Sequence, residues 1–466
     1  MPERALILEL NELCPSLLDR FMTAGDLPAF SRLHRESIVC TTDAGEPQGL
    51  LNPWIQWVTV HTGLGYADHG VFKLGEGGQQ HHETVGDVVT AHGGDVWLCG
   101  PMNVVPQRPL SGWWLPDPWN PHDPPQPADL APIAEFVRAN VQEHTNASHR
   151  LSVGTYRRFL TAMARHGLSA GTVAATLRQL VGERTGRAER WSRAALLDRF
   201  QWDLFVHHWR QARPQLATYF SNTTAHYQHV YWRYMDPGSF KLQPTPEEQN
   251  QFGGAVRSGY LEMDRLVGEA LDLVGDDTTL VLCTALSQQP YLLKDDEGGN
   301  RFHRPHDLAD VLERIGVLGV RKVSPVMAAQ FHVYFGTEAE AIAAADLLTS
   351  ATVGDRPALD VRRVGADVFT GIAFTDDVAP GAELRAGREA IPFEAHFYRA
   401  ETAKSGYHHP HGALWVRAPG GRHAVVEQPV PLRAAAPTLL ALLGLPIPAS
   451  MTEAPIPAVV GTAASA

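Results

Sequence analysis

The sequence has few cysteines, no long apolar run and no excess of basic residues, and each shortage excludes a class of protein. Four cysteines are scattered over 466 residues without a Cys-x-x-Cys pair, so buried free thiols in a reducing compartment are expected. No uninterrupted apolar stretch is long enough to span a bilayer. The formal net charge of -12 argues against general binding to nucleic acid, because phosphates require a basic face.

The N-terminus also lacks a basic region followed by an apolar one, which a secretory signal requires. It leads directly into an apolar segment, residues 5–10, that reads as a strand. We therefore expect a soluble, cytoplasmic protein that contacts neither nucleic acid nor membrane. Amide and imidazole groups that follow several expected strands favour a small anionic molecule as its substrate.

Compact apolar runs alternate with segments of helical periodicity, which is typical of an α/β fold. We predict a mostly parallel central sheet with helices on both faces, a helical cap and a smaller α+β insertion. The expected parts are a first core segment, the cap, a second core segment, the insertion, and a last core segment with a C-terminal arm: residues 1–127, 128–213, 214–290, 291–400 and 401–466. The arginines of the cap read as a solvated helical face, of which one or two could reach an anionic ligand.

Polar residues follow the expected strands, at the edge of an α/β sheet where ligands collect. Asn11 and Glu12 follow the first strand, although Glu12 could instead cap the helix that Pro15 opens. Asn52 precedes Pro53 at a helix start, a position suited to plain capping or to binding an anion. The segment 101–127 reads as a surface or lid rather than a sheet element.

Histidines gather in two places. His408, His409 and His411 lie on a Gly- and Pro-containing loop near the C-terminus, and His226 and His229 follow another expected strand. Imidazole is the commonest nitrogen ligand of zinc. The alternative is a polar turn with solvated histidines.

Three segments carry a resemblance to a known family. They are Thr62-Gly63-Leu64 through His69-Gly70, the closing helix around residues 436–446, and Gly406-Tyr407-His408. In these, and in the order of its elements, the chain resembles the alkaline phosphatase superfamily, most nearly the type I phosphodiesterase/nucleotide pyrophosphatase group.

The resemblance implies a site for two zinc-like ions held by Asp and His residues, but this chain departs from it. The first Asp corresponds to Asn11, a middle Asp-x-x-x-His pair to Asn222 and His226, and the last His to His408. A later Asp-His pair falls within residues 285–289, most nearly at Ser287 and Gln288, and no hydroxyl stands at the nucleophile position near Asn52.

Neutral amides do not offset the charge of two divalent ions. We therefore expect at most one divalent metal, zinc or similar, held by Asn222, His226 and His408, or no metal at all. His229, His409 or Glu12 could complete that site. A phosphorylated Thr intermediate is not expected.

The resemblance and the strand ends together suggest roles for these residues. His226, His408, His409 and Asn52 are the expected catalytic groups. The expected substrate-binding residues are Asn11, Glu12, Ser287, Gln288, Trp113 and Trp114, the tryptophans stacking on a base or sugar.

Three functions stay open at this point. The first is an enzyme acting on a phosphate or sulfate ester or a phosphodiester, such as a nucleotide-activated small molecule. The others are a group-transfer enzyme of a specialised biosynthetic pathway and a non-catalytic binding protein that retains the pocket.

Overall fold

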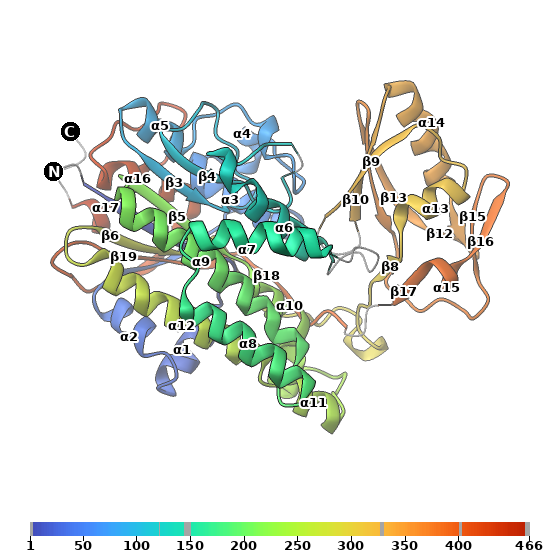
Figure 1. Cartoon of the computed structure of the whole chain (residues 1–466), viewed down its shortest axis with the longest axis horizontal. Helices are drawn as coiled ribbons and strands as arrows, with labels where there is room; N and C mark the ends of the chain where they lie inside the picture. The colour runs from blue at the N-terminus through green and yellow to red at the C-terminus, as the bar shows by residue number, and fades with distance from the viewer. Residues whose placement is uncertain (1–2, 121, 144–150, 327–329, 400–402, 462–466) are drawn as a thin grey trace. The chain divides into compact units, whose positions relative to one another are not determined.

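The computed structural model describes residues 3–120, 122–143, 151–326, 330–399 and 403–461. They form two compact units, coloured along the chain in Figure 1. Unit 1 consists of Met1–Glu135, Arg157–Tyr291 and Ser405–Ala466, and unit 2 of Phe136–Tyr156 and Leu292–Lys404. The site described below lies entirely in unit 1.

Unit 1 is built on an eight-stranded sheet with the order β20-β2-β19-β6-β1-β5-β3-β4. β19 runs antiparallel to β2 and β6, and the other neighbouring pairs are parallel, which confirms the predicted mostly parallel sheet. Every residue of β1, β5 and β6 is buried, as expected for parallel strands covered on both faces. The strands are β1 (Ala5–Leu10), β2 (Ile38–Asp43), β3 (Val96–Cys99), β4 (Gly112–Leu115), β5 (Leu216–Ser221), β6 (Thr279–Cys283), β19 (His411–Arg417) and β20 (Ala424–Pro431).

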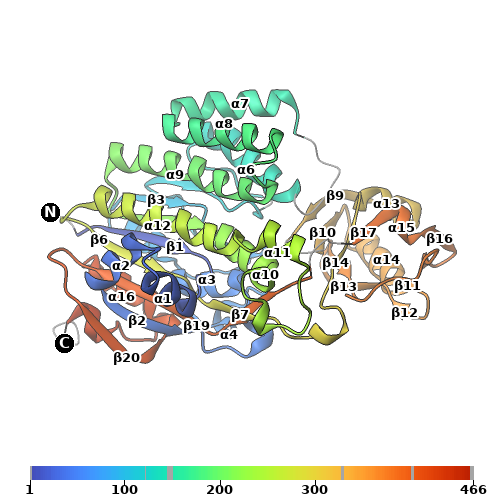
Figure 2. The ribbon, with the colours of Figure 1, turned by 90° about the horizontal axis from the view of Figure 1, so that it is seen from below.

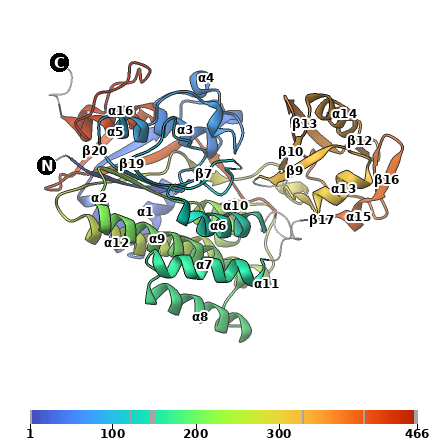
Figure 3. The same cartoon turned by 45° about the horizontal axis from the view of Figure 1, so that its top comes forward.

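Helices cover both faces of this sheet, as predicted. Figure 3 shows α3, α5 and α16 on one face and α1, α2, α9 and α12 on the other. Proline occupies the first turn of α1, α2 and α3, where its missing N–H removes no helical hydrogen bond. The helices of the core are α1 (Pro15–Thr23), α2 (Pro28–Arg35), α3 (Pro53–Thr62), α4 (Tyr66–His69), α5 (Val85–Ala91), α10 (Thr223–Met235), α11 (Pro246–Phe252), α12 (Ala255–Val274), α16 (Ala435–Leu442) and α17 (Pro457–Val460).

The described part of the predicted cap is helical, as expected. It contains α6 (Ala131–Glu143), α7 (Val153–Arg165), α8 (Ala170–Arg184) and α9 (Arg193–Ala212). Of these, α9 packs on β3 and β5, and α8 packs on α9.

The expectation that residues 101–127 hold no sheet element is wrong, because β4 extends the sheet beside β3. Glycine permits this close approach. A Cβ atom on Gly112 would lie 2.1 Å from the carbonyl oxygen of Val96, so any other residue would push the strands apart.

The predicted loop at 404–412 also contains a strand. β18 (Gly406–His409) pairs antiparallel with β7 (Ser287–Pro290), which places His408 opposite Gln288. This pairing joins the two segments that carry the expected late ligands.

Unit 2 has the predicted α+β character. It contains two four-stranded sheets, with the orders β13-β14-β10-β9 and β12-β11-β15-β16, and the pair β17-β8. Its elements are β8 (His303–Pro305), α13 (Leu308–Arg314), β9 (Val320–Pro325), β10 (Gln330–Phe335), α14 (Glu338–Thr349), β11 (Thr352–Val353), β12 (Arg356–Pro357), β13 (Leu359–Val364), β14 (Asp367–Ile372), β15 (Glu383–Ala386), β16 (Glu389–Pro392), α15 (Phe393–His396) and β17 (Phe397–Arg399).

The four cysteines are buried and unpaired, as predicted. A search of the described helices finds none with the length and apolar character needed to cross a bilayer.

Candidate metal and active site

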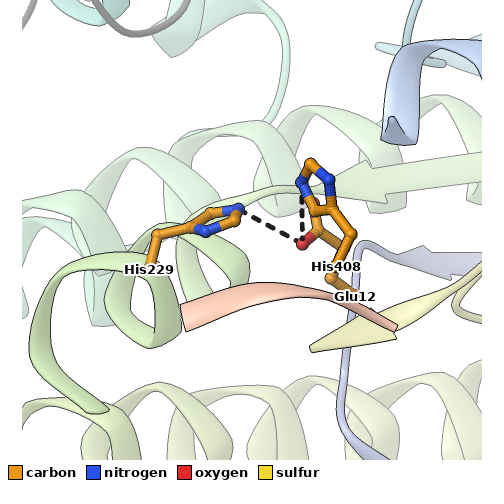
Figure 4. A group of neighbouring side chains, drawn as sticks. All are labelled: Glu12, His229 and His408. Atoms are coloured by element: carbon orange, nitrogen blue, oxygen red, sulfur yellow. Dashed lines mark ion pairs between the residues drawn. The ribbon is translucent and has the colours of Figure 1, made fainter. Parts of the chain in front are cut away.

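Three side chains far apart in sequence meet at one edge of the central sheet. One ligand atom from each of Glu12, His229 and His408 can be chosen so that all lie within 4.8 Å of one another. Figure 4 shows the two imidazole rings directed toward the Glu12 carboxylate. We call these three residues the triad.

Glu12 reaches the triad through an uncommon backbone conformation. Its φ of 55° lies in the left-handed region, which is unfavourable by about 1–2 kcal/mol for a residue with a Cβ. Its N–H donates to the carbonyl of Thr284, and only 1% of the residue is exposed. Glu12 does not cap α1, because the residue at the N-cap is Cys14 and no side chain caps that helix. Strain at a buried carboxylate is typical of a functional position.

Amide groups hold both oxygens of the Glu12 carboxylate. Asn11 Nδ2 donates to Oε1 at 3.1 Å, and Gln288 Nε2 donates to Oε2 at 2.6 Å. Gln228 Nε2 also donates to the backbone carbonyl of Glu12 at 2.8 Å. The carboxylate is therefore fixed in place before any ligand arrives.

The charges around Glu12 keep it ionised. Burial alone would raise its pKa, but the charges of His229 and His408 and the hydrogen bonds from His229 and Gln288 outweigh burial and lower the pKa from 4.5 to about 2. The triad thus contains a permanent buried anion at neutral pH.

His229 is oriented by a backbone carbonyl. Its Nδ1 lies 2.9 Å from the oxygen of Gly406, and because a carbonyl only accepts, Nδ1 must carry the hydrogen. The other ring nitrogen, Nε2, lies 3.2 Å from Oε2 of Glu12. In neutral His229 this nitrogen would present its lone pair to a carboxylate, so the contact requires either a proton or a cation between them.

His408 completes the triad from β18. Its Nε2 lies 3.7 Å from Oε2 of Glu12, and its ring meets that of His229 edge-on at 5.2 Å between centroids. Glycine at 406 allows the strand to lie this close to the site, since a Cβ there would lie 2.2 Å from Oε1 of Gln288.

Asn11 positions the site and is not itself a free contact for substrate. Its Oδ1 accepts from Trp57 Nε1 at 2.7 Å, and its Nδ2 donates to Asn222 Oδ1 at 2.7 Å as well as to Glu12. The parallel register that sets Leu10 opposite Ser221 brings the two asparagines together. Asn11, Glu12 and Asn222 therefore lie together as expected, but Asn11 uses its side chain to hydrogen-bond the other two.

The ligand set expected from the sequence differs from the one the structure assembles. His408 belongs to both sets, whereas His229 stands in the triad where His226 was expected. The side chain of His226 is exposed on α10 and lies against the rings of Tyr227 and Tyr231. Residues three apart on a helix point about 60° apart and lie about one turn apart along its axis. In the docked helix α10, His229 is the one whose ring contacts Glu12. No feature of the sequence distinguishes the two histidines.

Other expected site residues have local partners. Asn52 is the N-cap residue of α3 but makes no capping bond, and its Nδ2 donates to the carbonyl of Gly49 at 3.5 Å. Ser287 Oγ donates to the carbonyl of His411 at 2.5 Å. His409 Nδ1 accepts the N–H of His411 at 3.2 Å, which leaves that ring outside the triad.

Trp113 and Trp114 lie on β4, which β5 and β3 separate from β1. Trp113 contacts the ring of His208, and Trp114 is buried. The structure does not bring either of them to the triad.

The chain was compared with known proteins. No family model matches it, and no curated protein matches it.

Solved structures do match it over nearly their whole length. Phosphonoacetate hydrolase from Sinorhizobium meliloti 1021 is 15% identical, with 95% of this chain and 96% of that chain covered and a TM-score of 0.41. The alkaline phosphatase PafA is 11% identical, with 99% of each chain covered and a TM-score of 0.47. Murine ectonucleotide pyrophosphatase/phosphodiesterase 5 is 11% identical, with 96% of each covered and a TM-score of 0.40.

Proposed function

We propose that this protein is a hydrolase of small anionic esters of the phosphate or sulfate class and that its site holds one divalent metal ion. The observation that carries the proposal is the triad, in which one carboxylate and two imidazoles converge at the end of parallel strands. The resemblance of Thr62-Gly63-Leu64 and Gly406-Tyr407-His408 to phosphodiesterase segments gives the substrate class.

The triad has the donor chemistry of a catalytic zinc site. Two histidines and one glutamate are a known three-ligand set for catalytic zinc. Histidine ligands of zinc usually donate their second N–H to a carbonyl or carboxylate, as His229 does to Gly406. The contact between Nε2 of His229 and the ionised Glu12 would also be satisfied by a cation in place of a proton. A zinc ion bound here would supply Lewis-acid polarisation of an ester oxygen and help to activate water.

The neighbouring amides would bind and orient the anionic group. Asn11 fixes the Oδ1 of Asn222, so the Nδ2 of that partly exposed side chain is left to donate. Among the described residues no acceptor contacts this Nδ2. We assign Asn222 to the non-reacting oxygens of the ester.

We assign proton transfer to His226. It is exposed on α10, one turn before His229, and it is not needed to complete the triad. An imidazole can take or give a proton near neutral pH.

The test combines metal content with turnover. Protein purified without chelator is analysed by mass spectrometry for metals and assayed with bis-p-nitrophenyl phosphate, p-nitrophenyl phosphate and p-nitrophenyl sulfate. We expect about one divalent ion per chain, as a three-ligand site binds one ion. His408→Ala should lose the ion and lower turnover by about 100-fold or more.

The matched control is His423→Ala, which removes an exposed histidine whose hydrogen bonds within the described chain go to the carbonyls of His34 and Ser37. It should keep both the metal and the turnover. Absence of metal together with no turnover of any of the three esters would refute the proposal and favour a binding protein. Product analysis with an added alcohol separates hydrolysis from group transfer.

A further inference from the structure

Helix α8 directs its aliphatic side chains to solvent. Val173, Leu177, Leu180 and Val181 are exposed by 41%, 58%, 44% and 61%. Their spacing places them on one stripe of the helix. Of the fifteen residues of α8, all within the described chain, only Thr172 is buried. We call these four exposed residues the α8 stripe.

The polar side of α8 faces the protein instead. Gln179 donates to the carbonyl of Glu189 and accepts from Ser192. Arg193 pairs with Glu183. α8 packs on α9, and Figure 2 shows α7 and α8 as the outer layer above α9. The usual arrangement, in which a surface helix buries its apolar face, is therefore reversed.

Basic residues surround the α8 stripe. Residues 157–193 contain eight arginines and two glutamates, whereas the whole chain carries a net charge of -12. The exposed arginines on or beside α8 that form no ion pair within the described chain include Arg165, Arg178, Arg184, Arg187 and Arg190. The charge of the molecule is thus strongly divided, with its positive part at α7 and α8.

We propose that the α8 stripe is a docking face for an anionic lipid surface. Aliphatic side chains enter the boundary of the acyl chains, and the arginines around them bind lipid phosphates through paired N–H groups. The acidic remainder of the chain is repelled by the same surface, which orients the molecule with α8 toward the lipid.

Charge distinguishes this occupant from a second copy of the chain. A two-fold contact through the α8 stripe would set Arg178 and Arg184 of one copy near those of the other, and like charges oppose such a contact. A lipid surface, in contrast, neutralises these arginines. The proposal concerns surface attachment and is independent of the proposed hydrolase activity.

The test is co-sedimentation of the whole protein with vesicles. Phosphatidylcholine vesicles containing roughly one quarter phosphatidylglycerol are compared with pure phosphatidylcholine. We expect the anionic vesicles to bind the protein about tenfold more strongly or better, and raising salt from about 50 mM to about 500 mM to remove most of that binding. The double variant Leu177→Asp/Val181→Asp should bind about tenfold more weakly or less.

Val425→Asp is the matched control, because Val425 is 54% exposed on β20, away from the α8 stripe. It should bind like the unmodified chain. Equal binding to neutral and anionic vesicles, no binding to either, or unchanged binding by the double variant overturns the proposal. So does a dimer of the unmodified chain, seen by sedimentation velocity, that becomes a monomer in the double variant.

Discussion

Replacing Glu12 by Gln tests whether the buried carboxylate is the organising charge of the site. The change keeps the size of the side chain and removes its negative charge. Glu12 is 1% exposed and interacts with His229 and His408 through the same oxygen that Gln288 binds.

The magnitude follows from the pKa of Glu12. Burial raises it, but the two histidines outweigh burial and lower it from 4.5 to about 2, and a shift of that size corresponds to about 3 kcal/mol. Because the folded pKa is the lower one, the contribution to stability is fully present above about pH 4.5 and is lost as pH falls toward 2. In metal-free protein at neutral pH, Glu12→Gln should therefore lower the free energy of unfolding by about 3 kcal/mol.

The assay is urea unfolding in the presence of chelator, repeated between neutral and acid pH. The unmodified chain should lose stability across the window from 4.5 to 2, and the Gln variant should lack that part of the decline. The exposed Glu427 on β20 provides the control Glu427→Gln, which we expect to stay within about 0.5 kcal/mol of the unmodified chain. Equal stability and equal pH dependence of the Glu12 variant and the unmodified chain would refute the assigned charge network.

Zinc adds a second comparison. A ligand that binds only the folded state stabilises it by about 2.7 kcal/mol at 100 times its dissociation constant. The unmodified chain should gain stability on addition of Zn²⁺, and the Gln variant should gain little. A similar gain in both would place the metal elsewhere.

Three further predictions concern single residues. His229→Ala should abolish zinc binding measured by calorimetry, whereas His226→Ala should retain binding but lower ester turnover; the reverse result would restore the ligand set expected from the sequence. His61→Ala leaves the fully buried Glu9 without its imidazole partner at 2.8 Å. We expect it to lower the free energy of unfolding, measured with urea, by about 3–5 kcal/mol, and a decrease below about 1 kcal/mol would contradict this expectation. Burial raises the pKa of Asp198 from 3.8 to about 7, so the folded state favours the protonated form. The free energy of unfolding should therefore decline as pH rises from about 4 to about 7. Asp198→Asn should remove that decline when urea unfolding is repeated over this pH range.

The sequence determined the architecture of the core. Apolar runs such as residues 5–10 and 216–221 form fully buried parallel strands, because a strand covered on both faces needs a nearly continuous apolar run. The one charged residue in these runs, Glu9, is paired with His61. The polar residues after those strands then had to lie at one edge of the sheet, which is why Asn11, Glu12 and Asn222 meet as expected.

The sequence did not determine which histidine joins them. His226 and His229 have similar local surroundings along the chain. Their side chains point in different directions from α10, and which of them faces Glu12 is decided only when the helix is packed in place. Likewise the strand β18 was expected to be a loop, because its pairing partner β7 lies more than a hundred residues earlier. Local patterns contain no information about such a distant partner.

Tertiary structure also decided the backbone of Glu12 and the exposure of α8. A left-handed residue between two hydrogen-bonding strand ends cannot be recognised from its type, since glutamate rarely adopts that conformation. The stripe of Val173, Leu177 and Val181 has the spacing of an ordinary buried face, and only the packing of α8 through its polar side shows that it faces outward. The sequence alone determines the composition and the hydrophobic period of each helix and strand. Which face of that element is buried depends on the elements it packs against in the folded protein.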